Sequence, residues 1–274
     1  MTRRRPRVPA VLAGLAVLVA LAVLGLDRIG SATGVVLPWS PGDLLPASVR
    51  DHPQRGFEEA DERLVPPATV AEPGTSYVYQ HTVVEDGRTL PVAWSPCRPV
   101  HVVVDPTGAP PDFPAQVHAA LDELAAATGL VIVDDGLVTE PPGLDRAAYQ
   151  PERYGDRWAP VLIGFADETT VPDLAGSVAG IASVQAVEAP VSRDAHLVTG
   201  TVYLDTELLR PAPGRTGSEH LAVLRHELGH VVGLDHVDDP TQLMHPTSGG
   251  VPTFQAGDLT GLAELGRGRC APGV

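Results

Sequence analysis

The chain has 274 residues and a formal net charge of −15, and 43% of its residues are hydrophobic. This length and composition suffice for one domain of ordinary size with a well-buried core. All of its positive side chains are arginine, and the large excess of acidic residues argues against a nucleic-acid-binding protein.

Residues 1–32 have the pattern of a segment that enters a membrane. A cluster of arginines precedes an uncharged apolar run from Val8 to Leu26. As a helix these residues would cover about 28 Å, close to the hydrocarbon thickness of a bilayer and longer than a typical secretory core segment. The length favours a retained anchor, whereas Gly30-Ser31-Ala32 would suit cleavage of a signal. In both cases we expect the arginines to stay in the cytoplasm and the rest to cross.

Residues 33–75 are rich in proline and charge and have little hydrophobic periodicity. This composition predicts a linker or stalk, with a removable propeptide as the alternative. The remaining residues, 76–274, are predicted to form one folded domain.

Hydrophobic patterning divides this domain into strands and helices. Continuous or alternating apolar runs predict strands, and apolar residues three or four apart predict helices. The predicted strands are residues 100–104, 130–133, 160–165, 180–187 and 198–205. The predicted helices are residues 114–127, a helix that begins near Ser218, and residues 257–265. The order is therefore one strand, one helix, four strands and two helices.

The chain has two cysteines, Cys97 and Cys270. An even count in a domain outside the cytoplasm predicts a disulfide between them. This bond would tie the first strand to the C-terminal tail.

The predicted helix after Ser218 carries the motif HExxHxxGxxH in residues 226–236. Residues four apart lie on one face of a helix, so His226 and His230 can bind the same ion. Gly233 falls where the helix must end, because glycine can take the left-handed conformation, and the chain then returns with His236. Glu227 projects beside the ion, a position that suits a general base.

Three protein ligands leave a fourth position for water, as in catalytic zinc sites. Zinc lowers the pKa of such a water to about 7 and polarises a bound carbonyl. The motif therefore predicts a hydrolase with one catalytic Zn²⁺ and Glu227 as the base that passes a proton to the leaving amine. The alternatives are a solvated helix face, which would not need Gly233 or His236, and a hydrolase of non-peptide amides.

Residues 226–246 resemble the metzincin metalloproteases, and within them the matrixins. Met244 stands in a Leu-Met-His-Pro segment eight residues after His236, where matrixins have Leu-Met-Tyr-Pro. The resemblance implies that Met244 lies in a tight turn beneath the three histidines. Val237 and His245 depart from the serine and tyrosine of the family.

Two upstream segments are also similar to bacterial matrixin-type peptidases that have a membrane or secretion segment. They are residues 94–100, Trp-Ser-Pro-Cys-Arg-Pro-Val, and residues 157–161, Arg-Trp-Ala-Pro-Val. The resemblance spans about residue 76 to the end of the chain. It implies an α+β, metzincin-like (zincin) fold with a twisted, mostly parallel five-stranded sheet and an antiparallel edge strand. An active-site helix and a C-terminal helix complete that fold, with the transmembrane or signal helix before it.

The implied activity is zinc-dependent endopeptidase cleavage of protein or peptide substrates outside the cytoplasm. The domain would be held at the cell membrane by residues 1–32, or secreted after their removal. The edge strand expected to pair with an extended substrate contains Gly180, Ile181, Ala182 and Ser183. The alternative from another class is a non-catalytic, metal-stabilised surface protein that binds peptides.

The chain departs from matrixins in two further properties. Matrixin latency comes from a cysteine placed on the zinc, but Cys97 lies at the entry to the predicted strand of residues 100–104 and not in a removable segment. Residues 203–207 are similar to a matrixin calcium segment, but their second acid comes one place early, so Ca²⁺ is possible without being supported. The oligomeric state and the natural substrate have no signal in the sequence.

Overall fold

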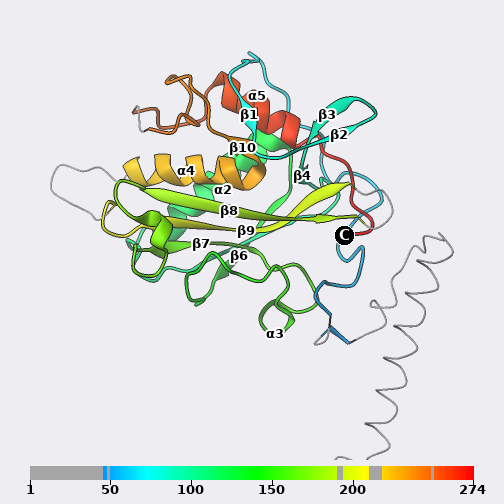
Figure 1. Cartoon of the computed structure of the whole chain (residues 1–274), viewed down its shortest axis with the longest axis horizontal. Helices are drawn as coiled ribbons and strands as arrows, with labels where there is room; N and C mark the ends of the chain where they lie inside the picture. Colours follow the sequence, from blue (N-terminus) through cyan, green and yellow to red (C-terminus); the bar gives the residue numbers. More distant parts are fainter. Residues whose placement is uncertain (1–45, 48–49, 190–193, 210–217, 248–249) are drawn as a thin grey trace, which may run out of the picture.

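The computed structural model describes residues 46–47, 50–189, 194–209, 218–247 and 250–274 (Figure 1). The predicted anchor or signal segment, residues 1–32, lies outside these ranges. Within them, no helix is both long enough and apolar enough to cross a membrane.

A six-stranded sheet forms the centre of the molecule (Figure 1). Its order is β4 (Ala93–Trp94), β9 (Ala195–Asp205), β7 (Val161–Ala166), β5 (Val100–Val104) and β6 (Ile132–Leu137), with β8 (Gly180–Glu188) also paired to β9. All neighbours are parallel except β8, which runs antiparallel to β9. The mostly parallel sheet and its antiparallel strand are as predicted. The predicted count of five strands omits β4, whose two residues are too few to give a pattern.

Helices and loops cover the two faces of the sheet. The helices α2 (Phe113–Thr128), α4 (Ser218–Val232) and α5 (Ala256–Leu265) gather on one side (Figure 1). Successive side chains of a strand point to opposite faces, so Val102 and Val104 join the core under α2 and α4. Val103 joins a second cluster with Leu162 on the other face. That face is covered by residues 138–160, with α3 (Pro151–Tyr154), and by the short helix η3 (Pro172–Leu174).

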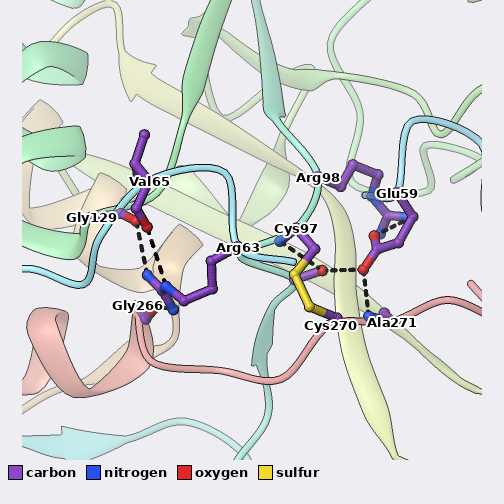
Figure 2. Close-up of a disulfide and its surroundings, with 10 residues drawn as sticks. Glu59, Arg63, Val65, Cys97, Arg98, Gly129, Gly266, Cys270 and Ala271 are labelled. Carbon is purple, nitrogen blue, oxygen red and sulfur yellow. Dashed lines mark hydrogen bonds and ion pairs between the residues drawn. A yellow bond between two sulfur atoms is a disulfide. The ribbon is translucent and has the colours of Figure 1, made fainter. Parts of the chain in front are cut away.

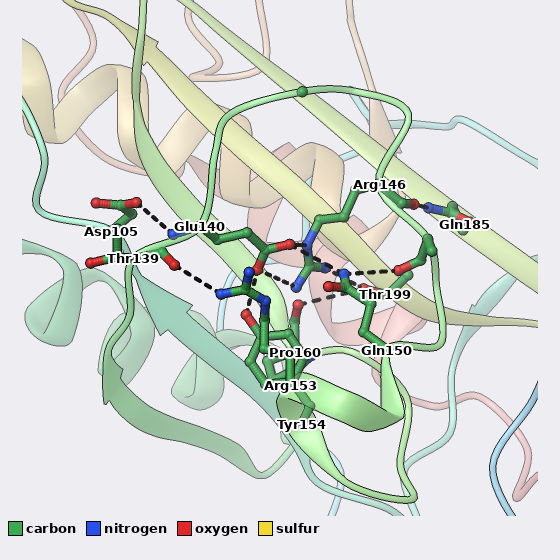
Figure 3. Close-up of polar contacts among 12 residues, drawn as sticks. Asp105, Thr139, Glu140, Arg146, Gln150, Arg153, Tyr154, Pro160, Gln185 and Thr199 are labelled. Carbon is green, nitrogen blue, oxygen red and sulfur yellow. Dashed lines mark hydrogen bonds and ion pairs between the residues drawn. The ribbon is translucent and has the colours of Figure 1, made fainter. Parts of the chain in front are cut away.

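A buried polar network fixes residues 138–160 to the sheet (Figure 3). Arg146 forms an ion pair with Glu140 at 2.8 Å and donates a hydrogen bond to Thr199 Oγ1 of β9 at 3.1 Å. The hydroxyl of Tyr154 also donates to Glu140. Burial alone would raise the pKa of Glu140, but hydrogen bonds from Arg146 and Tyr154 and the charge of Arg146 outweigh it and lower the pKa. The carboxylate of Glu140 is therefore charged in the folded protein.

Two small antiparallel sheets were not predicted. One pairs β1 (Val78–Tyr79) with β10 (Leu234–Asp235), immediately before the third histidine of the motif. The other pairs β2 (Thr82–Glu85) with β3 (Arg88–Pro91) through a two-residue turn. Strands of two to four residues are too short to show periodicity, and their partners are distant or local contacts that composition does not reveal.

The predicted disulfide between Cys97 and Cys270 is present (Figure 2). Beside it, the carboxylate of Glu59 accepts hydrogen bonds from Ser95 Oγ and from the backbone N–H of Ala271.

The described part of the expected linker therefore lies along the domain. Arg63 donates to the carbonyls of Gly266 and Gly129, at 2.9 and 3.2 Å (Figure 2). The sequence predicted a free linker over residues 33–75. The described part of that segment, from residue 50 onward, instead binds the domain: Arg63 donates to its backbone carbonyls, and the carboxylate of Glu59 accepts from Ser95 and Ala271.

Candidate metal centre

The structure brings together the three histidines of the motif. His226 and His230 lie on α4, and His236 follows β10. The Nε2 atom of His236 is 3.1 Å from the Nε2 atoms of both His226 and His230. The three rings therefore point one nitrogen each at a common centre, which is a group that could hold a metal ion.

Hydrogen bonds to the far side of two rings fix which nitrogen carries a proton. The Nδ1 atom of His226 is 2.7 Å from the carbonyl oxygen of Leu243, and that of His230 is 2.8 Å from the carbonyl oxygen of Leu234. A carbonyl only accepts, so each Nδ1 donates and each Nε2 presents a lone pair to the common centre.

The electrostatics of the site favour neutral rings. Burial and the neighbouring imidazoles lower the pKa of His226 to about 4. Burial also lowers the pKa of His230 and of His236. Three neutral imidazoles with converging lone pairs are the donor set of a catalytic Zn²⁺ site, so the residues present fit that ion.

Glu227 lies next to the first histidine on α4 and is 5% exposed. Burial raises the pKa of Glu227 to about 8. Its side chain lies against Gly180, the first residue of β8. The structure thus places the predicted base beside the predicted substrate strand.

Gly233 directly follows the last residue of α4 and has a φ of +119°. Its backbone N–H bonds to the carbonyls of His230 and Gly229, at 3.0 and 3.2 Å. This left-handed conformation favours glycine and turns the chain into β10, which delivers His236.

Met244 is 1% exposed and packs against Gly229, the residue of α4 that lies between His226 and His230 in the sequence. Its carbonyl accepts a hydrogen bond from Val237 N at 3.1 Å, so the methionine turn is joined to the segment after the third histidine. The preceding carbonyl, of Leu243, orients His226.

Several supporting residues were not singled out from the sequence. Asp258 of α5 accepts hydrogen bonds from Leu243 N at 2.8 Å and Met244 N at 3.4 Å. It also forms a capping box with Gln255, and that pattern at the start of a helix could have drawn attention to it. Gln80 donates its backbone N–H to the carbonyl of Gly233 at 2.9 Å, a contact with no signal in the sequence.

The four residues of the expected substrate strand open β8. Gly180 to Ser183 pair with residues 201–204 of β9, and all four are half-buried. Among the described residues, β9 is the only strand paired with β8, so its other edge has no strand partner.

The segment similar to a matrixin calcium site, residues 203–207, makes local hydrogen bonds. One carboxylate oxygen of Asp205 accepts the backbone N–H of Leu208 in its own turn. Within the described ranges, the only other ligand cluster besides the histidine triad is Glu59 with the disulfide-bonded Cys97 and Cys270. Calcium thus gains no support from these contacts.

Comparison with known proteins adds one positive finding. The matrixin family model matches residues 161–265. A search of curated proteins found no match to the chain. The matched range begins with β7 and ends with α5, and it contains β8, β9, the histidine triad and the methionine turn. Residues 161–265 are therefore similar to the matrixins, and this similarity supports a zinc metallopeptidase as the general class of the protein.

Proposed function

We propose that this protein is a zinc-dependent endopeptidase that hydrolyses peptide bonds of extracytoplasmic proteins. The observation that carries the proposal is the convergence of the three histidine Nε2 atoms, with His236 Nε2 3.1 Å from the other two, beside the buried Glu227. When bound there, Zn²⁺ supplies Lewis acidity that activates a water molecule and polarises a substrate carbonyl.

The protein side chains have separate roles in this proposal. His226, His230 and His236 hold the ion through Nε2, and their positions are kept by Leu243, Leu234 and the turn at Gly233. Glu227 accepts the proton of the attacking water and delivers it to the nitrogen of the leaving amine. Burial raises the pKa of the Glu227 carboxyl to about 8, so this carboxylate takes up a proton more readily than an exposed one. The positive charge of a bound Zn²⁺ would oppose that rise and favour the ionised form that acts as the base.

The free edge of β8 supports an extended peptide as substrate. An unpaired strand edge offers alternating N–H and C=O groups that can pair with the backbone of another chain. Such pairing does not require a charged terminus, so cleavage inside unfolded or loop segments is expected.

The Cys97–Cys270 bond supports action outside the cytoplasm, since such bonds persist in oxidising compartments. The pattern of residues 1–32 supports retention at the membrane, with secretion after cleavage as the alternative.

The test uses the full chain and a library of fluorescence-quenched peptides, together with measurement of bound zinc. The wild-type protein should contain one zinc ion and cleave internal peptide bonds, and a chelator should abolish cleavage. Glu227→Ala should keep zinc and lose about 10²- to 10⁴-fold in rate. Unchanged cleavage by Glu227→Ala would contradict the mechanism. Zinc binding without any cleavage by the wild-type protein would favour the metal-stabilised peptide-binding alternative.

A further inference from the structure

We infer that Gly180 is a positioning residue for Glu227. The missing side chain at this first residue of β8 leaves the space that the glutamate side chain occupies. The inference rests on the proposed role of Glu227, and the geometric contact beneath it can be tested separately.

The contact between β8 and α4 at this point is very close. A β-carbon built on Gly180 would lie 2.8 Å from Val223 Cγ1 and 2.9 Å from both Cγ and Oε1 of Glu227. Val223 and Glu227 are four residues apart, so they lie on the same face of the helix, one turn apart. Gly180 therefore lies against a single turn of α4, and any larger residue would displace one of these two side chains.

Backbone conformation does not explain the glycine. Gly180 is absent from the glycines that have a positive φ, so an alanine could adopt its backbone geometry without strain. The lack of room beside Val223 and Glu227 is therefore what excludes a side chain at residue 180.

Pairing with β9 holds this part of β8 in its position beside the helix. Gly180 pairs with Leu204 of β9, which is fully buried, and the carbonyl of Ala179 accepts the N–H of Asp205 at 2.9 Å. Because β9 holds the backbone on both sides of Gly180, an added methyl group has to be accommodated by α4. Val223 is branched at its β-carbon and has restricted rotation, whereas the unbranched side chain of Glu227 can change rotamer and so move both its Cγ and its carboxylate. Displacement of the carboxylate is therefore the expected response.

This arrangement links the general base to substrate binding. The backbone that sets the position of Glu227 is the start of the strand proposed to pair with the peptide. A shift of about 1 Å in a catalytic group can lower the rate by about 10²-fold, so a single methyl group at residue 180 should affect turnover more than binding.

The first experiment compares Gly180→Ala with Gly143→Ala in the full chain. Gly143 is the matched control, because its φ is not positive and no atom lies within 4 Å of a β-carbon built there. With one quenched peptide selected from the library, Gly180→Ala should lower kcat by about 10- to 100-fold with KM changed less than about twofold. Bound zinc should stay at the wild-type level, and Gly143→Ala should match wild type. An unchanged kcat, or a loss confined to KM, overturns the inference.

The second experiment tests the contact without any activity measurement. The loss of thermal midpoint caused by Gly180→Ala is measured in the wild-type protein and in a Glu227→Ala background. Removing the glutamate side chain opens the space, so the loss should be smaller in that background. An equal loss in both backgrounds overturns the contact. If the wild-type protein cleaves no peptide, the proposed function fails, and this comparison alone decides for or against the contact.

Discussion

Gly229 separates the first two histidines of the triad and is the point where α4 meets the methionine turn. A β-carbon built on it would lie 2.5 Å from Met244 Sδ and 3.1 Å from Met244 Cε. In an exposed helix interior, replacing glycine by alanine stabilises a protein by about 1 kcal/mol. At Gly229 the clash with Met244 opposes that gain. The sign of the change in unfolding free energy therefore shows which of the two effects is larger.

We therefore predict that Gly229→Ala lowers the free energy of unfolding by about 1–3 kcal/mol, the usual cost of overpacking a core. Because Leu243 next to Met244 orients His226, zinc affinity should fall as well. Urea unfolding and zinc titration against a competing chelator measure the two effects. A more stable variant would show that the turn adjusts freely to the added methyl group.

Asp258 connects α5 to the methionine turn through hydrogen bonds from Leu243 and Met244. It is fully buried, and its two oxygens accept N–H groups from Leu243, Met244 and Gln255. Burial raises the pKa of Asp258, and these hydrogen bonds partly offset that rise.

Asp258→Asn replaces one accepting oxygen by an N–H₂ donor that faces donors. We expect a loss of about 1–3 kcal/mol in unfolding free energy, as for other buried groups left unpaired. Zinc binding should weaken, because the carbonyl of Leu243 that orients His226 belongs to the same turn. Unfolding curves with and without zinc would separate the two effects, and equal zinc affinity in the two proteins would contradict the link.

At the scale of elements, the Glu140–Arg146 pair determines how residues 138–160 respond to acid. The pKa of Glu140 is lowered in the folded protein, so its contribution to stability is present above its unfolded pKa, about 4.3 for a free glutamate. That contribution is lost as the pH falls below this value through the folded pKa.

The wild-type protein should therefore lose stability between about pH 5 and pH 3 more steeply than Glu140→Gln does. At neutral pH the variant should be less stable by about 3 kcal/mol, because it leaves Arg146 buried without its charged partner. Thermal midpoints measured across this range test both statements, with exposed Glu152→Gln as the control. Parallel pH profiles of wild type and Glu140→Gln would exclude Glu140 as the responding group.

Elements with long patterns were predicted to within a few residues, and short or polar ones were not. The predicted helix of residues 114–127 is α2, Phe113–Thr128, because its apolar spacing covers four turns. The strand predicted at residues 130–133 is instead Ile132–Leu137, since pairing with β5 carries it through two exposed aspartates. A ladder of backbone hydrogen bonds decided that boundary, against the local hydrophobic pattern.

The site divides in the same way. His226, Glu227, His230, Gly233 and His236 form one local motif, so the sequence could predict them together. The contacts made by Gly180, Gly229 and Asp258 depend on how α4, α5 and β8 approach each other in space. Spacing along the chain carries no information about such approaches.

At the scale of the whole molecule, the disulfide joins residues 173 positions apart. Closing a loop of this length removes about 5 kcal/mol of unfolded-chain entropy in the simplest treatment, and measured effects are typically about 2–4 kcal/mol. Cys97 is also fully buried, between the described N-terminal segment and the C-terminal tail.

Replacing both Cys97 and Cys270 by serine should therefore lower the unfolding free energy by about 2–5 kcal/mol. The wild-type protein in strong reductant should approach the same value. Urea unfolding of the two proteins, each with and without reductant, provides the measurement. If reductant destabilised the double variant as much as wild type, its effect would not come from this bond.

The attachment of residues 50–75 also defines a mechanical path. Tension applied upstream of residue 50 would first load the ion pair of Arg50 with Asp156 and the bond from Arg55 to the carbonyl of Gly273. It would then reach Glu59, which binds Ser95 and Ala271, and Arg63, which binds the carbonyl of Gly266 after α5. The covalent bridge then carries the load between the sheet and the tail. A molecule pulled from its N-terminal side would thus be strained first at these contacts of residues 50–63.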